Sequence, residues 1–357
     1  MSHHPDSMLK KNTEKILVTG ATGFIGSHLV LELLKRGYSV RALYRSEKSK
    51  RKLENLFRLY KKSRLIDSVE WFHGDILCTT SIEEALDGIS RVFHTAAIVS
   101  FDRRRAEEML QINRVGTANL VNLSLQSDIK HFIHFSSIAA LGGNLNRHTE
   151  EDIWSWTKPH TVYAASKFAG EMEVWRGMQE GLQAAILNPS VVAGPGFWNT
   201  GFGLTVRKVI QKKWPFYTTG VTGYVDVRDT VQIALALMEK QISGERFIVS
   251  EGNYSFREIL HGIARHAQVK PPRHKLSPLT LRTALPLMNA HAMLIGKGFM
   301  PDKNLIKTLF DRDYYDNRKT KTTLEFQYTP IEQTLAFTVK KYFENLLINQ
   351  SENKIST

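Results

Sequence analysis

The chain of 357 residues has little cysteine and no uninterrupted run of 18 apolar residues. A single cysteine, Cys78, excludes an internal disulfide framework and is typical of a reducing compartment. The absence of a long apolar run excludes a hydrophobic membrane span, and the polar start of the chain lacks the apolar centre of a signal peptide. We therefore expect a soluble, cytoplasmic protein.

Acidic residues are also scarce, with 35 Asp and Glu against 48 Lys and Arg and a formal net charge of +13. Between Arg41 and Arg64, ten basic residues accompany only Glu47 and Glu54. Such a local excess suits one particular anion. Zinc-finger spacing and RNA-binding aromatic motifs are both missing, so we expect no nucleic-acid partner. His3 and His4 indicate a solvated tail, and no bound metal is predicted.

The first half of the sequence alternates short β-branched segments with helical patterns, which is typical of βαβ units in a parallel sheet. We predict strands at 15–20, 38–44, 69–74, 91–96, 131–137 and 184–190, and helices near 24–36, 49–60, 81–87, 103–127 and 161–180. Right-handed crossovers between these strands predict an α/β fold with a doubly wound parallel sheet of the Rossmann type.

The second half predicts a smaller C-terminal substrate-binding lobe, with a last strand of the main sheet near 244–252. The apolar segment 276–296 is interrupted by Arg282 and Pro286, so it predicts either the roof of an apolar pocket or a packing helix. The predicted division is a disordered tail at 1–13, a dinucleotide-binding domain at 14–190 plus 223–252, a lobe at 191–222 plus 253–345, and a disordered tail at 346–357.

A glycine-rich turn follows the first predicted strand and precedes the first predicted helix. In the spacing Gly20-x-x-Gly23-x-x-Gly26, glycines permit a tight turn and let the backbone approach a pyrophosphate, whose charge the helix N-terminus favours. The segment predicts a dinucleotide site. A close-packed strand-to-helix turn is the alternative.

Tyr163 and Lys167 lie four positions apart in TVYAASKFAGEM, and therefore on one helix face. Lowering a phenol from a pKa of ~10 to near 7 requires ~4 kcal/mol. A cation ~4 Å away at an effective dielectric of ~20 supplies about that much. A solvated pair is the alternative, but Ser136 and Ser137 at the end of a predicted strand favour an acid/base couple, because ligands bind at that edge.

Together these features resemble the extended short-chain dehydrogenase/reductase family over residues 15–260. The motifs occur in the family's order: GATGFIG (20–26), GDI (74–76), VFHTAA (92–97), INRVGTANLV (112–121), FSSIAALG (135–142), YAASK (163–167) and LNPSVVAGPG (187–196). The resemblance implies that Tyr163 exchanges a proton with the substrate and that Lys167 tunes it and holds the nicotinamide ribose. It implies that Ser137 orients the substrate oxygen, since Gly142 follows at the family's usual distance.

The resemblance also implies a role for Asn113 and a set of cofactor contacts. Asn113 matches an asparagine that supports a proton relay; a buried asparagine at a helix kink is the alternative. The implied contacts are Gly20, Thr22, Gly23, Phe24, Ile25 and Gly26 in the glycine turn, Asp75, Ile76, Ala96 and Ala97 at the adenine and its ribose, Tyr163 and Lys167, and Pro189 and Val192 beside the nicotinamide.

The second predicted strand lacks a terminal acid, which NAD-preferring enzymes use to bind ribose hydroxyls. Tyr44 stands there, and Arg45 with Lys48 or Lys52 could hold a 2′-phosphate. The surrounding stretch is similar to that of NADP-dependent dihydroflavonol reductase-like enzymes. NADP is therefore favoured over NAD, with a solvated helix face as the alternative for these cations.

The branch that the sequence resembles includes dihydroflavonol reductases and 3β-hydroxysteroid dehydrogenases, which implies an NAD(P)-dependent oxidoreductase acting on a carbonyl or alcohol. Ile138 and Ala139 replace the Asp-Glu pair of dehydratases. Phe197, Trp198 and Phe202 favour an apolar substrate, unless they belong to the core. The alternatives are a nucleotide-sugar epimerase with tightly bound NAD and a non-catalytic cofactor-binding regulator. Many relatives are homodimers, so a homodimer is expected.

Overall fold

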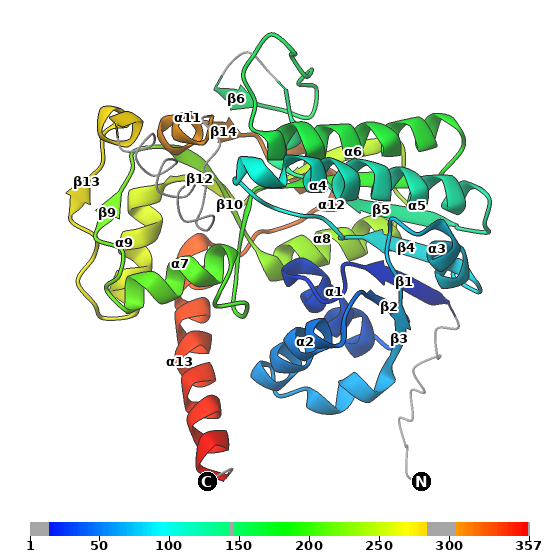
Figure 1. Cartoon of the computed structure of the whole chain (residues 1–357), viewed down its shortest axis with the longest axis horizontal. Coiled ribbons are helices and arrows are strands. Elements are labelled where there is room, and N and C mark those ends of the chain that lie inside the picture. The colour runs from blue at the N-terminus through cyan, green and yellow to red at the C-terminus, as the bar shows by residue number, and fades with distance from the viewer. Residues whose placement is uncertain (1–13, 143–145, 284–303, 356–357) are drawn as a thin grey trace, which may run out of the picture.

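The computed structural model describes residues 14–142, 146–283 and 304–355 (Figure 1). The predicted tail at 1–13 and most of the apolar segment 276–296 lie outside the described residues. Among those that are described, no helix is both long and apolar enough to cross a bilayer.

A parallel sheet of seven strands forms the centre, in the order β11-β7-β5-β4-β1-β2-β3, which confirms the predicted doubly wound fold. Most residues of its central strands are buried, because helices cover both faces of the sheet. They span Lys15–Thr19 (β1), Ser39–Tyr44 (β2), Val69–His73 (β3), Arg91–His94 (β4), His131–Phe135 (β5), Ala184–Pro189 (β7) and Glu245–Val249 (β11).

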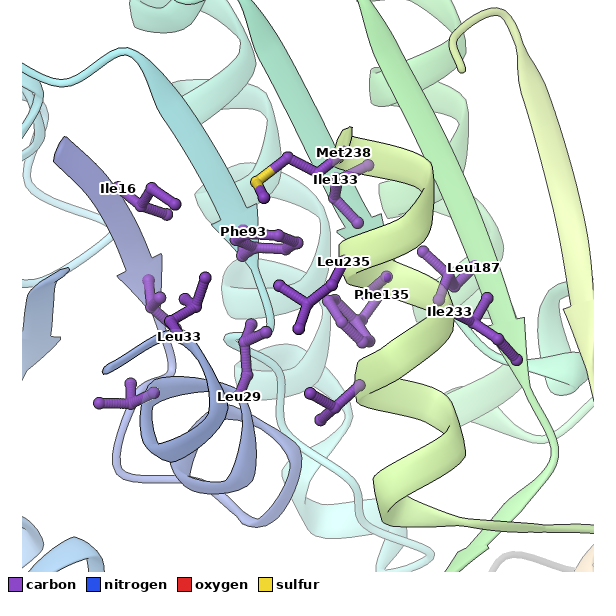
Figure 2. Close-up of a cluster of buried hydrophobic side chains, with 14 of the residues drawn as sticks. Ile16, Leu29, Leu33, Phe93, Ile133, Phe135, Leu187, Ile233, Leu235 and Met238 are labelled. Atoms are coloured by element: carbon purple, nitrogen blue, oxygen red, sulfur yellow. The ribbon is translucent and has the colours of Figure 1, made fainter. Parts of the chain in front are cut away.

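Two apolar clusters fill the space between the sheet and its helices. Successive strand residues point to opposite faces, so Ile16 and Phe93 join one cluster while Leu17 and Val92 join the other. Figure 2 shows the first cluster, in which Leu29 and Leu33 of one helix and Ile233, Leu235 and Met238 of another meet the strands. The first cluster involves α1 (Phe24–Lys35), α2 (Glu47–Leu59) and α8 (Val227–Glu239); the second involves α3 (Thr79–Leu86), α5 (Gly116–Leu125) and α6 (Val162–Gln179).

The smaller lobe contains a three-stranded sheet and a third apolar cluster. Its elements include β8 (Val191–Ala193), β10 (Val221–Asp226), β12 (Gly252–Ser255), α7 (Gly201–Ile210), α9 (Phe256–His266) and α13 (Ile331–Ile355). Short pairs join β9 (Phe216–Tyr217) to β13 (His274–Lys275) and β6 (Arg147–His148) to β14 (Tyr314–Tyr315), and α11 covers Leu305–Phe310.

The structure divides the two parts differently from the predicted boundaries. Residues 223–226 of β10 fall within the predicted dinucleotide-binding domain, but β10 pairs with β8 and β12, whereas β11 pairs with β7 of the large sheet. Conversely, α12 (Arg318–Leu324) leaves the lobe and packs on β11, where Thr320 Oγ1 donates to the Ile248 carbonyl at 2.7 Å.

The predicted disordered tail at 346–357 is wrong for most of its length, since α13 continues to Ile355. Ile331, Leu335, Val339 and Tyr342 recur on one face of α13 and are buried. Once these turns have formed, each further helical residue adds a backbone hydrogen bond and needs no new nucleation. The helix therefore extends beyond the apolar face and projects from the body of the molecule (Figure 1).

Candidate active site

The glycine turn joins β1 to α1 where β4 also ends. Gly20 has a φ of +68°, and a Cβ there would lie 2.6 Å from the Ala96 backbone nitrogen. A Cβ on Gly26 would lie 2.2 Å from the Gly20 carbonyl oxygen, while the Gly23 N–H donates to that oxygen at 2.8 Å. Only glycine fits Gly20 and Gly26. The first-turn N–H groups at Phe24 and Ile25 have no acceptor earlier in the helix.

Ser137 and Tyr163 meet beyond the end of β5. Ser137 precedes a short 3₁₀ turn, and its hydroxyl accepts from the Ala139 N–H at 3.1 Å. Tyr163 lies in the first turn of α6, which Thr161 caps by accepting from the Ala164 N–H at 3.1 Å. Burial raises the pKa of Tyr163, while its side-chain hydrogen bond with Ser137 opposes that rise.

Lys167 lies one turn further along α6 and is 3% exposed. Its Nζ donates to the Phe135 carbonyl at the end of β5, at 2.8 Å. Burial lowers the pKa of Lys167 to about 8, against the opposing charge of Glu171. The expected lowering of the Tyr163 pKa by Lys167 is not seen. Burial of the phenol raises this pKa, and the side chain that opposes the rise is that of Ser137.

Asn113 lies in a π-helical turn, Gln111–Val115, between α4 (Ala106–Leu110) and α5. The predicted helix at 103–127 is therefore interrupted. The Asn113 amide nitrogen donates to the Ile98 carbonyl and to Ser166 Oγ, both at 2.9 Å, and its oxygen accepts from the Ile98 N–H at 2.8 Å. Asn113 thus has the features of a buried helix-kink residue that ties the segment after β4 to α6. A part in proton transfer stays a prediction.

The residues predicted at the adenine follow β3 and β4. Asp75 is partly buried and accepts from the Leu77 N–H at 3.0 Å. Ile76 is 4% exposed and packs so closely on α5 that a Cβ at Gly116 would lie 2.5 Å from it. Ala96 touches the glycine turn, and Ala97 is exposed.

The basic residues after β2 have two different environments. Lys50 Nζ lies 4.0 Å from the centre of the Tyr44 ring and also pairs with Glu47 at 3.0 Å. Arg45, Lys48 and Lys52, the three cations predicted to bind phosphate, are exposed. They lie just before and within the first two turns of α2.

Pro189 and Val192 lie where the chain passes from β7 of the main sheet to β8 of the lobe. Pro189 is buried and Val192 is partly buried against the first apolar cluster. The nearby Phe197 ring lies 5.7 Å from that of Phe24, so the following loop contacts the start of α1. Thr22, in the same turn as Phe24, is partly buried.

Sequence reasoning missed a buried polar network behind the site. Glu171 Oε2 accepts from Ser136 Oγ at 2.6 Å and from Asn188 Nδ2 at 2.7 Å. The Asn188 amide also donates to the Ser137 carbonyl at 3.0 Å, and an Arg246 nitrogen lies 3.1 Å from Glu171 Oε1. A signal was available, because Glu171 stands four residues after Lys167 and so shares its side of α6.

These elements define a dinucleotide-binding fold with a Ser-Tyr-Lys set at the carboxyl edge of its sheet. Residues 16–250 match the NAD dependent epimerase/dehydratase family, and the chain belongs to that family. The predicted resemblance to extended short-chain dehydrogenases/reductases is confirmed.

Two relatives are similar to this chain in sequence, and one solved structure is similar to it in fold. The chain is 32% identical to sterol demethylase protein B of Methylococcus capsulatus, covering 73% of this chain and 77% of that protein. It is 28% identical to a putative dihydroflavonol 4-reductase of Synechocystis, covering 92% and 94%. The structure of UDP-glucuronic acid 4-epimerase from Bacillus cereus in complex with NAD has a TM-score of 0.72 at 20% identity, covering 92% and 96%.

The protein is accordingly an enzyme of NAD(P)-dependent type. Its residues fit such a cofactor. Side chains at Gly20 and Gly26 would strike backbone atoms, so the β1–α1 turn stays bare where a pyrophosphate would reach the N-terminus of α1. Lys167 is a buried ammonium at the same edge and donates to one backbone carbonyl, Phe135. Its other two N–H groups suit ribose hydroxyls.

Proposed function

We propose that the protein is an NADP-dependent oxidoreductase that interconverts a carbonyl and an alcohol on a largely apolar small molecule. The observation that carries the proposal is that the Ser137 and Tyr163 side chains lie together at the end of β5, one helical turn from the buried Lys167, whose Nζ donates to the Phe135 carbonyl at 2.8 Å. A carbonyl oxygen placed between the two hydroxyls would have two donors on one atom.

Bound NADPH would supply the hydride, because no protein side chain can carry one. Tyr163 would donate its proton to the oxygen that gains negative charge. Ser137 would donate a second hydrogen bond to that oxygen while its own oxygen keeps the bond from the Ala139 N–H. Lys167 would donate to the nicotinamide ribose, and its positive charge would favour the phenolate left on Tyr163.

The exposed cations after β2 support NADP. The end of β2 carries Tyr44 in place of an acid, so no carboxylate there repels a 2′-phosphate. Arg45 offers a planar fork for phosphate oxygens, and Lys48 adds its charge in the first turn of α2. Lys52 would contribute one turn later.

An apolar substrate is supported by the names of the relatives, a sterol demethylase protein and a dihydroflavonol reductase. The aromatic residues of the loop support it less than their sequence predicts. Phe202 is 9% exposed in the third apolar cluster, and the Trp198 ring packs 5.1 Å from that of Tyr342. Phe202 belongs to the core of the lobe, and Trp198 is partly buried against it.

A homodimer in the cytoplasm completes the proposal. Val115, between α4 and α5, and Met172 on α6 are 38% and 44% exposed, on the helices that would pair. Sedimentation equilibrium would test this part, with a concentration-independent monomer mass as the contradicting result.

Nucleotide-sugar epimerisation is the second candidate, supported by the matched fold of the UDP-glucuronic acid epimerase. Incubation with NADPH and a panel of ketones, aldehydes and UDP-sugars separates the two candidates. Net loss of NADPH absorbance with a ketone or aldehyde supports the reductase. An isomerised sugar without NADPH loss would replace it with the epimerase.

A further inference from the structure

We infer that Glu171 is a positioning residue, which holds Lys167 as an ammonium and fixes the strand end that carries Ser137. The inference rests on the proposed role of Lys167 in holding the cofactor ribose. It concerns a side chain that is 1% exposed and lies behind the site rather than in it.

The first link runs along α6. Lys167 and Glu171 are four residues apart on one helix, so their side chains are neighbours. The charge of Glu171 opposes the lowering of the Lys167 pKa that burial causes. Both groups are buried, where water screens their interaction less than it would at the surface.

The second link runs through two strands of the main sheet. Ser136, at the end of β5, donates to Glu171 Oε2, and Asn188 of β7 donates to the same oxygen. Asn188 Nδ2 also donates to the Ser137 carbonyl at 3.0 Å. Glu171 is therefore linked directly to the Ser136 side chain and, through Asn188, to the Ser137 carbonyl.

The third link is Arg246 on β11, which pairs with Glu171 Oε1 at 3.1 Å. Arg246 also donates to the Glu150 and Asp152 carbonyls, at 2.7 and 2.5 Å. The Glu150 side chain accepts from the Ile248 N–H at 2.8 Å, which secures the same loop to β11. Removing one partner from such a buried network leaves the other polar groups unsatisfied.

The other titratable groups beside Lys167, two histidines and Tyr163, carry no negative charge. The negative charge that acts on Lys167 therefore comes from Glu171. His94 on β4 and His134 on β5 lie with ring centres 5.1 Å apart, and burial lowers the pKa of His94 to about 3 and that of His134 well below its usual value. Both imidazoles are therefore neutral near pH 7. Tyr163 is neutral as well, because burial raises its pKa.

The test measures NADPH affinity by fluorescence between pH 6 and 10, without any substrate. In the wild type, affinity should fall above pH about 8, where Lys167 loses its proton. Glu171→Gln keeps the shape of the side chain but removes its charge. The pH above which NADPH affinity falls should therefore decrease by about one unit. Turnover of a carbonyl substrate at pH 8 should drop about fivefold, in proportion to the protonated fraction of Lys167.

Two control variants separate charge from structure. Glu180→Gln makes the same change at the exposed end of α6, where the carboxylate pairs with Arg176 at 2.6 Å, and should leave the profile unchanged. Ser136→Ala removes one hydrogen bond to Glu171 but keeps its charge, so the alkaline fall should stay at the wild-type pH. A folded Glu171→Gln protein with the wild-type profile would overturn the inference.

If Glu171→Gln does not fold, Arg246→Gln provides the opposite test. Loss of that cation leaves more negative charge near Lys167, so the fall should move to higher pH; an unchanged or lowered position would overturn the inference. Because the readout is cofactor affinity, it is separate from the proposed reaction. A protein that binds NADPH but reduces no carbonyl would contradict the proposed function and leave this test intact.

Discussion

The two ends of the proposed cofactor site are built differently. At the nicotinamide end, Lys167 is 3% exposed and Ser137 is 8% exposed, and each is held by hydrogen bonds to the backbone. At the adenosine end, Arg45, Lys48 and Lys52 are all exposed. Proton transfer requires fixed distances, whereas a phosphate can be recognised by long cationic side chains that order around it. Substitutions should therefore act sharply at the first end and gradually at the second.

Tyr163→Phe should give the largest effect, a loss of turnover of about a thousandfold, because the reaction loses its proton donor. NADPH affinity should stay nearly unchanged, since Ser137 keeps its bond with the Ala139 N–H and Lys167 keeps its bond with Phe135. Steady-state kinetics and a fluorescence titration measure the two quantities. Substantial remaining turnover would remove Tyr163 from the chemistry.

Gly26→Ala should weaken NADPH binding on the order of tenfold or more, because the new Cβ would lie 2.2 Å from the Gly20 carbonyl oxygen and displace the turn. Gly37→Asn is a suitable control, since Gly37 has a φ of +80° that Asn tolerates and open space around it. Equal losses in both variants would mean that the β1–α1 turn has no special part in binding.

Arg45→Asp should reduce NADPH affinity about tenfold and leave NADH affinity similar or improved, because a carboxylate repels a 2′-phosphate and suits ribose hydroxyls. Arg64→Asp makes the same charge change at an exposed position of the same basic segment. Isothermal titration of both cofactors compares the variants. Identical behaviour of the two would assign the preference to overall charge.

A smaller effect is expected from His148, in the loop that Arg246 clamps behind the nicotinamide end. Burial lowers the pKa of His148, but hydrogen bonds to Asp313 and Asp152 outweigh it and raise the pKa above its ordinary value. The stabilisation is then complete below the unfolded pKa of about 6.5 and is lost as pH rises through the folded pKa.

We therefore expect the melting temperature of the wild type, relative to that of His148→Gln, to fall by about 1–2 °C between pH 6 and pH 8. Differential scanning fluorimetry on both proteins isolates this contribution from other titrations. A difference between the proteins that does not change with pH would contradict the assignment.

Sequence patterns predict the local features of this molecule well. β-Branched segments locate the six strands of the first half, and the glycine spacing locates the turn, because each depends on residues close in the chain. The course of β10 could not be predicted this way. Its sequence, VTGYVD, suits either sheet, and only the pairing with β8 and β12 decides between them.

The candidate site shows the same limit. Tyr163, Lys167 and Ser137 could be named from motifs, but the pairing of the buried Glu171 with the partly buried Arg246 depends on strands that meet across the sheet. Sequence could not distinguish Lys50, which covers the Tyr44 ring, from the exposed Lys48, since both stand in one basic run. The rotation of α2 about its axis, relative to β2 and β3, decides which lysine faces the Tyr44 ring.

The most direct test of the central claim follows hydride from the cofactor into the product. Deuterium placed at C4 of NADPH, on one face and then the other, should appear as one deuterium per product alcohol for one of the two faces, and the Tyr163→Phe variant should form this labelled product about a thousandfold more slowly. Mass spectrometry of the product reads this directly. Product that forms with neither label, or a sugar that isomerises while NADPH is retained, would contradict an NADP-dependent reductase.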